Sequence, residues 1–259
     1  MARHTARHTA RHTPRPSARP TVLLTAVVAS AALALTACST GSSDAGDTAR
    51  SAAGTSSAAG NASGAPASSS AGVLGAGFAD PDEPPAPEAT IHPRPGSWSG
   101  VHPPEGYRVV LLADAGDAAD DAATRTLVRA VGSWAAEEHV DVTRVTASDA
   151  DDRIGAVTRA VDARPDLVIS VGDHMVDPLA AVSPSALHQQ FLVVGAEIAE
   201  PTSNVTAADW TGAGFRGEGL GASSHHDPAT FTDERAGRAL RAGAAAVLHD
   251  LRGIVVWVR

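Results

Sequence analysis

The sequence predicts an α/β protein with a single three-layer, doubly wound parallel sheet in residues 96–259. Two observations favour this fold class. From Tyr107 onward, short apolar segments alternate with segments of helical length. The stretch DLVISVG (166–172) is a continuous apolar run ending in glycine, which is typical of a central strand covered on both faces. Residues 107–259 are also numerous enough to bury one sizeable core.

The elements follow one another in a regular order. Strands are expected at 107–114, 140–147, 166–172, 190–196, 204–210 and 253–258. Helices are expected at 118–138, 149–163 and 233–250, with a further helix after Asp177-Pro178. Asp177 and Thr232 are the expected N-caps. Segment 140–147 alternates in polarity, which indicates an edge strand. Right-handed crossovers then favour the strand order 2-1-3-4-5, with any ligand crevice at the carboxyl ends of the strands.

The N-terminal segment has the layout of a secretory signal. Residues 1–20 contain five arginines and no acidic residue, and an uncharged apolar run of 17 residues, Thr21 to Ala37, follows. As a helix this run would span roughly 25 Å, which is short for a hydrocarbon core of about 30 Å. It ends in Leu35-Thr36-Ala37-Cys38, which resembles the bacterial lipobox. We therefore expect residues 1–37 to be a lipoprotein signal peptide. Cys38 is expected to be acylated, which anchors the protein to the lipid bilayer of the cell membrane on its extracytoplasmic side. A free cysteine in an ordinary signal peptide is the alternative.

Residues 38–95 are expected to form a disordered tether. They are dominated by Ala, Ser, Gly, Pro and Thr and contain few large apolar side chains, so they cannot bury enough surface to offset the entropy of ordering. A flexible coil of this length has a root-mean-square span of about 40 Å.

Charge and residue usage exclude several functions. All 20 basic residues are arginine, and after Cys38 the chain has 15 arginines against 29 acidic residues, which argues against a nucleic-acid partner. No G-x-S-x-G motif occurs, no P-loop is possible without lysine, and lipidation would use the single cysteine. We therefore expect neither an enzyme nor a cofactor.

A series of short motifs carries a family resemblance. The first motif is a Pro165-Asp166 pair that opens an apolar strand ending at Gly172, in RPDLVISVGDHMVDPLAAV. A strand led by Phe191 follows in QQFLVVGAE, and an Asn204-Val205 turn then enters a short strand in NVTAADW. In this series the chain resembles the basic membrane protein family of lipoproteins, which are substrate-binding components of ABC importers and are related to purine-nucleoside binders. The resemblance implies the first lobe of a type I periplasmic-binding fold. It also implies a small-molecule solute and an ABC permease as partners, with a second copy of the chain as a possible source of the opposite wall.

Polar residues follow the expected strands where ligands bind in this architecture. Gly172, Asp173 and His174 come after the central strand, and Asp114 and Asp117 come after the first strand. The resemblance adds Glu197: the family tends to place an acidic residue just after the Phe-led strand, whereas this chain has Gly195 and Ala196 there and the acidic residue follows at Glu197. These six residues are the expected ligand contacts. The alternative for Asp114, Asp117 and Asp173 is that they cap the following helices.

Two further motifs lack a supporting context. HHDP (225–228) with Glu218 nearby has no spaced third histidine ligand, so no metal site is expected. GAGFRG (212–217) matches a dinucleotide-binding pattern, but the residues after it do not form the required helix.

Taken together, these patterns predict a membrane-anchored extracytoplasmic lipoprotein that captures or senses a small, nucleoside-like solute. The alternative is a surface scaffold that keeps the fold of the lobe without a ligand.

Overall fold

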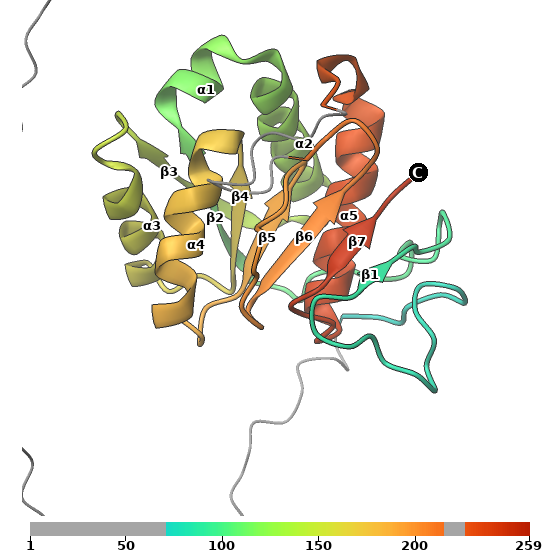
Figure 1. The fold of residues 1–259 in the computed structure, drawn as a ribbon. Helices are drawn as coiled ribbons and strands as arrows, with labels where there is room; N and C mark the ends of the chain where they lie inside the picture. The colour runs from blue at the N-terminus through green and yellow to red at the C-terminus, as the bar shows by residue number, and fades with distance from the viewer. Residues whose placement is uncertain (1–70, 215–225) are drawn as a thin grey trace, which may run out of the picture. The chain divides into compact units, whose positions relative to one another are not determined.

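The structure, a computed structural model, describes residues 71–214 and 226–259 (Figure 1). Cys38, the signal segment and most of the expected tether lie outside these residues. Seven parallel strands form one sheet in the order β1-β7-β6-β5-β4-β2-β3. The strands are Thr90–Ile91 (β1), Arg108–Asp114 (β2), Asp141–Ala147 (β3), Leu167–Val171 (β4), Phe191–Val194 (β5), Val205–Asp209 (β6) and Val255–Trp257 (β7). The helices are Ala115–Asp120 (α1), Ala122–Glu138 (α2), Arg153–Asp162 (α3), Val176–Val182 (α4) and Asp233–Leu248 (α5).

The predicted fold class and strand order are confirmed. The expected order 2-1-3-4-5 is the observed run β3-β2-β4-β5-β6, and β7 adds to it. All five residues of β4 are buried, as a central strand requires, whereas the first four residues of β3 are exposed at the edge of the sheet. Helices α2 and α5 cover one face of the sheet, and α3 and α4 cover the other (Figure 1).

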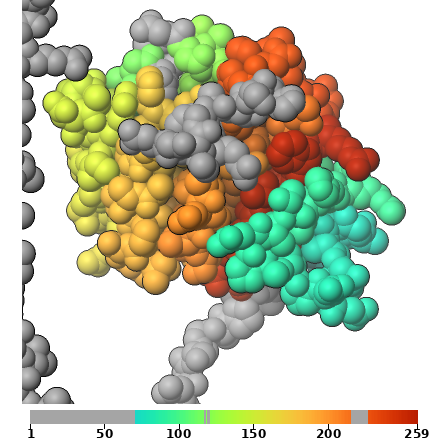
Figure 2. Space-filling view, viewed as in Figure 1, coloured from blue at the N-terminus to red at the C-terminus, as the bar shows by residue number. Residues whose placement is uncertain are grey.

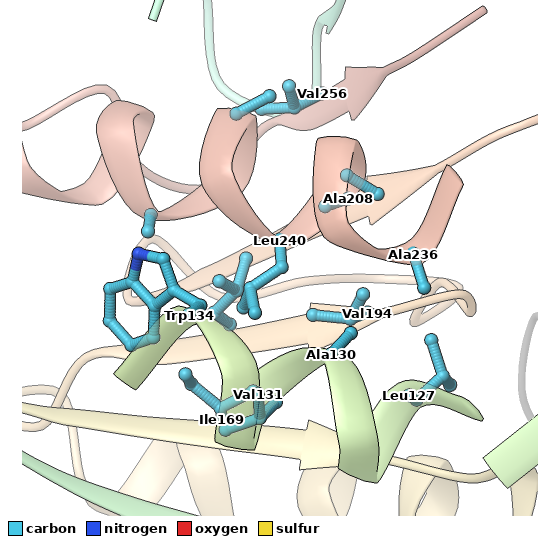
Figure 3. Packing of buried hydrophobic residues seen from close by; sticks show 14 of the residues in the cluster. Leu127, Ala130, Val131, Trp134, Ile169, Val194, Ala208, Ala236, Leu240 and Val256 are labelled. Carbon is cyan, nitrogen blue, oxygen red and sulfur yellow. The ribbon is translucent and has the colours of Figure 1, made fainter. Parts of the chain in front are cut away.

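The larger core cluster lies between the sheet and the α2–α5 pair. Figure 3 shows side chains of α2 and α5 pointing toward Ile169, Val194, Ala208 and Val256 of the sheet. Gly243 lets α5 approach closely, because a Cβ at this position would lie 2.6 Å from Cδ1 of Leu192 and 2.9 Å from Cβ of Ala208. The close packing of this helix on the sheet therefore depends on a residue without a side chain.

Residues 71–95, which the sequence analysis assigned to the tether, are part of the folded unit. Thr90 and Ile91 pair in parallel with Val255 and Val256, and Ala71 and Phe78 are buried. In Figure 2 this N-terminal segment, coloured teal, lies against the red C-terminal elements. The difference arises because a few apolar side chains of this Pro- and Gly-rich segment, Phe78 among them, pack against the core, and β1 pairs with β7.

Helix boundaries differ in places from the expected ones. The expected helix 118–138 is divided into α1 and α2, because the Asp121 side chain caps α2 by accepting a hydrogen bond from the Thr124 N–H at 2.5 Å. Asp177 was expected as an N-cap, but α4 begins two residues earlier than this predicts, at Val176, with Met175 in the cap position. Thr232 is confirmed as the cap of α5, since its hydroxyl accepts the Arg235 N–H at 3.2 Å.

Candidate functional site

The carboxyl ends of all seven strands meet at one edge of the sheet, which is where open α/β sheets bind ligands. The direction in which successive strands are added to the sheet reverses between β2 and β4. The chain leaves β2 for the edge strand β3 on one side and returns through α3 to β4 on the other side. Two cavities lie along this edge. We call the one beside β4 and the start of α2 the switch cavity, and the one at the ends of β6, β7 and β1 the β6–β7 cavity.

Asp114, at the end of β2, holds the two neighbouring segments in place. Its side chain is 5% exposed; Oδ1 accepts the Gly116 N–H at 2.8 Å, and Oδ2 accepts the Arg153 Nε–H at 2.8 Å. The contact with Gly116 is the capping role that the sequence analysis weighed for this residue. The contact with Arg153 is an ion pair that sequence reasoning missed. These contacts give Asp114 a structural role at the edge.

The switch cavity gathers three of the six expected ligand contacts. Gly172, Asp173 and His174 line a volume of about 240 Å³ together with the N-terminal turn of α2 and the side chains of His226 and Phe231. Gly172 has a φ of 92°, a left-handed conformation that suits glycine and turns the chain abruptly out of β4. The Asp117 side chain lies outside the described structure, so its place relative to this cavity is not assigned.

Asp121 gives the switch cavity a stable negative charge. Partial burial raises the pKa of Asp121, but hydrogen bonds from Thr124 and from the Ala123 N–H, together with the nearby Arg125 charge, outweigh this effect and lower the pKa below its ordinary value. The carboxylate therefore stays ionised at neutral pH.

A ring contact fixes the wall of the switch cavity. Phe231 lies edge-on to Trp210, with ring centroids 5.0 Å apart, and Trp210 Nε1 donates a hydrogen bond to Thr230 Oγ1 at 3.0 Å. Since Trp210 directly follows Asp209, the segment carrying His226 and Phe231 is tied to the end of β6.

The β6–β7 cavity is larger, with a volume of about 490 Å³, and it contains the remaining expected contact, Glu197. Asp209 and Trp257 line it as well; these two residues are paired in register on β6 and β7. His92, one residue beyond the Ile91–Val256 pair, continues this row onto the end of β1. Glu197 is 9% exposed and Asp209 is 1% exposed. The cavity therefore combines two largely buried carboxyl groups, an indole and an imidazole.

Sequence reasoning missed three of these four residues. Asp209 ends a strand as Asp114 does, so its position was a usable signal. His92 was assigned to the tether, and Trp257 falls in an apolar strand whose neighbours on both sides cannot be read from the sequence. Glu197 and the Gly172-Asp173-His174 turn belong to different cavities, so the structure does not bring the six expected residues together.

No group of three His, Cys, Asp or Glu residues that suits a metal ion occurs within residues 71–214 and 226–259. His225 and Glu218 of the weighed metal motif lie outside this part of the chain. In the same described portion, no helix has both the length and the apolar character needed to cross a bilayer.

Comparisons with known proteins give structural likenesses at low identity. No protein family model matches the chain, and no curated protein matches it. A candidate lipoprotein fragment from Peptoclostridium difficile 630 is similar at 18% identity and a TM-score of 0.41, over 55% of this chain and 98% of that one. An ABC transporter solute-binding protein from Aeropyrum pernix K1 is similar at 22% identity and a TM-score of 0.36, over 41% of this chain and 29% of that one. A periplasmic ribose ABC transporter protein from Conexibacter woesei DSM 14684 is similar at 17% identity and a TM-score of 0.32, over 60% of this chain and 54% of that one. The chain thus spans less than two thirds of the two transporter proteins.

Proposed function

We propose that this protein is a membrane-anchored lipoprotein that binds a small, hydroxyl-rich, nucleoside-like solute in the β6–β7 cavity. One observation carries the proposal: the carboxyl groups of Glu197 and Asp209 and the indole of Trp257 line a single volume of about 490 Å³. A volume of several hundred Å³ is the usual size for a small-molecule site with a few convergent polar groups.

The chemistry of the lining fits a ring that carries hydroxyl groups. Carboxylate oxygens accept hydrogen bonds from neighbouring hydroxyls, and such charge-assisted bonds are roughly twice as strong as neutral ones. The half-buried indole of Trp257 offers an apolar surface to the ligand ring. Because Glu197 and Asp209 are largely withdrawn from water, their hydrogen bonds to a ligand meet less competition from solvent.

In this proposal the switch cavity is a separate, second candidate site. Gly172, Asp173 and His174 lie at the reversal of strand order. Asp114 acts indirectly, since its contacts with Gly116 and Arg153 position the segments around this cavity.

The lipid on Cys38 would hold the binding domain outside the membrane, where an ABC permease is the proposed partner. Two acyl chains provide durable attachment, because each buried methylene contributes about 0.8 kcal/mol. The preceding arginine-rich and apolar segments are the sequence features that support export.

A thermal-shift panel tests the proposal on the full chain with adenosine, guanosine, ribose, glucose and amino acids. A ligand at 100 times its dissociation constant adds about 2.7 kcal/mol of stability, which raises the Tm by about 5–10 °C. We expect Asp209→Asn and Glu197→Gln to abolish the nucleoside or sugar shift, while Glu200→Gln, at an exposed position, leaves it unchanged. A flat panel would overturn solute binding and favour the scaffold alternative.

A further inference from the structure

One wall of the β6–β7 cavity belongs to the N-terminal segment. Thr90 is in β1 and His92 comes one residue beyond its end, and both line the cavity together with Glu197 and Asp209. We call residues 86–94, which contain β1, the strap. The strap lies within the expected tether (38–95). Since Thr90 and His92 belong to the cavity lining, the cavity is complete only when this segment is docked on β7.

The strap is held by few contacts. Its strand has two residues, and backbone hydrogen bonds join the Glu88 N–H to Gly253 O at 2.7 Å, the Val255 N–H to Ala89 O at 2.9 Å and the Arg94 N–H to Gly77 O at 2.8 Å. Pro93 is the one buried residue of the strap; Ala89 and Ile91 are only partly buried, and the remaining six residues are exposed. Segments with short strands and little buried apolar surface open locally at a lower free energy than the core.

The proline content of the strap lowers the conformational entropy that the segment loses when it docks. Pro87 and Pro93 lie within it, and Pro85 and Pro95 flank it. Proline restricts the undocked chain to fewer conformations, so less conformational freedom is lost when the segment docks.

We propose that the strap is a detachable wall of the binding site, so that solute occupancy and docking of the strap on β7 stabilise each other. A ligand that contacts Thr90 or His92 together with Asp209 binds the docked state better than the open state, and this difference shifts the equilibrium toward docking. The ligand part of this inference rests on the function proposed above. Its consequence is that binding would hold residues 86–94 against β7.

Hydrogen exchange with mass spectrometry on the full chain in mild detergent tests the inference, with adenosine as the probe. Without ligand, strap amides should exchange much faster than the β4 amides, and the β7 amide of Val255 should lose protection with them. Adenosine at saturation should slow strap exchange at least about tenfold beyond any change in β4. Strap exchange that occurs only with global unfolding would overturn the inference without any reference to ligand.

The ligand arm separates the two proposals. If a thermal shift shows that adenosine binds but strap exchange does not change, the coupling is wrong and solute binding stands. If neither adenosine nor ribose binds, the proposed function fails and the coupling fails with it, while the ligand-free exchange still decides whether the strap opens.

A matched pair of variants gives an independent readout. Ile91→Asp removes the partly buried side chain that holds the strap without changing a residue of the cavity lining, and should weaken adenosine binding about tenfold because the docked fraction falls. Val73→Asp makes the same kind of change at a position that is 77% exposed and should alter affinity less than about twofold. Equal affinities for the two variants would contradict the inference.

Discussion

Asp114 Oδ2 accepts a hydrogen bond from Arg153 Nε at 2.8 Å, joining the end of β2 to the first residue of α3. The carboxyl side chain is 5% exposed and the guanidinium side chain 23% exposed, so the pair is largely withdrawn from water. Removing one partner of such a pair leaves a poorly solvated charge behind, which costs more than replacing both.

We therefore expect Asp114→Ala to lower the free energy of unfolding by about 3 kcal/mol. The double variant Asp114→Ala with Arg153→Met should lose less than the sum of the single changes. Urea unfolding measures all four proteins of this cycle. Additivity within about 0.5 kcal/mol would show that the pair is not energetically coupled.

Gly243 and Gly132 should respond oppositely to alanine. At Gly243 a new Cβ would press on Leu192 and Ala208, and overpacking costs about 1–3 kcal/mol, more than the helix-propensity gain of about 1 kcal/mol. At Gly132, in α2, no atom lies within 4 Å of the new Cβ, so alanine should stabilise the protein by up to about 1 kcal/mol. Thermal unfolding of both variants is the check; a stabilised Gly243→Ala protein would contradict the close approach of α5 to the sheet.

Stability should fall on acidification because of His249. Burial lowers the pKa of His249, although the charge of Asp250 opposes this, and Nε2 is a buried atom without a hydrogen-bond partner among the described residues. The folded state therefore binds this proton less readily than the unfolded state. The stability that neutral His249 contributes is fully present above the unfolded-state pKa of about 6.5. It is lost as the pH falls through the lower pKa of the folded state.

Urea unfolding at about pH 7.5 and about pH 5.5 measures this effect on either side of the ordinary histidine pKa. His249→Gln should reduce the loss of stability between the two pH values. His188→Gln, at an exposed histidine, is the control and should keep the wild-type loss. An unchanged pH dependence in His249→Gln would contradict the prediction.

Membrane attachment should depend on Cys38. In a bacterial host, Cys38→Ala should move the protein from the membrane fraction to the soluble fraction and remove palmitate labelling, because the proposed lipid attachment requires this thiol. Equal labelling of the two proteins would rule out acylation at Cys38. Cys38→Ser provides a near-isosteric comparison and should behave like the alanine variant.

The sequence predicts the sheet well because each main strand has a recognisable local pattern of apolar and polar residues. The run 166–172 is apolar throughout, and β4 is buried throughout; segment 140–147 alternates, and β3 lies at the edge. Crossover handedness then determines the order of the strands. The sequence does not predict β1, because a two-residue strand in a Pro-rich segment is too short to show an alternation of polar and apolar residues. Its pairing with β7 also depends on residues more than 160 positions away.

The site is less predictable, since it depends on which strand ends become neighbours. The row His92, Trp257, Asp209 comes from three strands that are adjacent only in the folded sheet. Asp114 also ends a strand, and Gly116 and Arg153 engage its carboxylate, which gives it a structural role. Local sequence therefore identifies polar strand ends and leaves their roles undetermined.

The indole N–H signals in a ¹H–¹⁵N NMR spectrum test solute binding in the β6–β7 cavity most directly. The chain has four tryptophans, and the Trp257 signal can be assigned with Trp257→Phe. Adenosine should shift the Trp257 signal and leave that of Trp134, buried between α2 and α5, in place, and Asp209→Asn should abolish the shift. A Trp257 signal that stays unmoved at saturating adenosine, guanosine and ribose would contradict solute binding in this cavity.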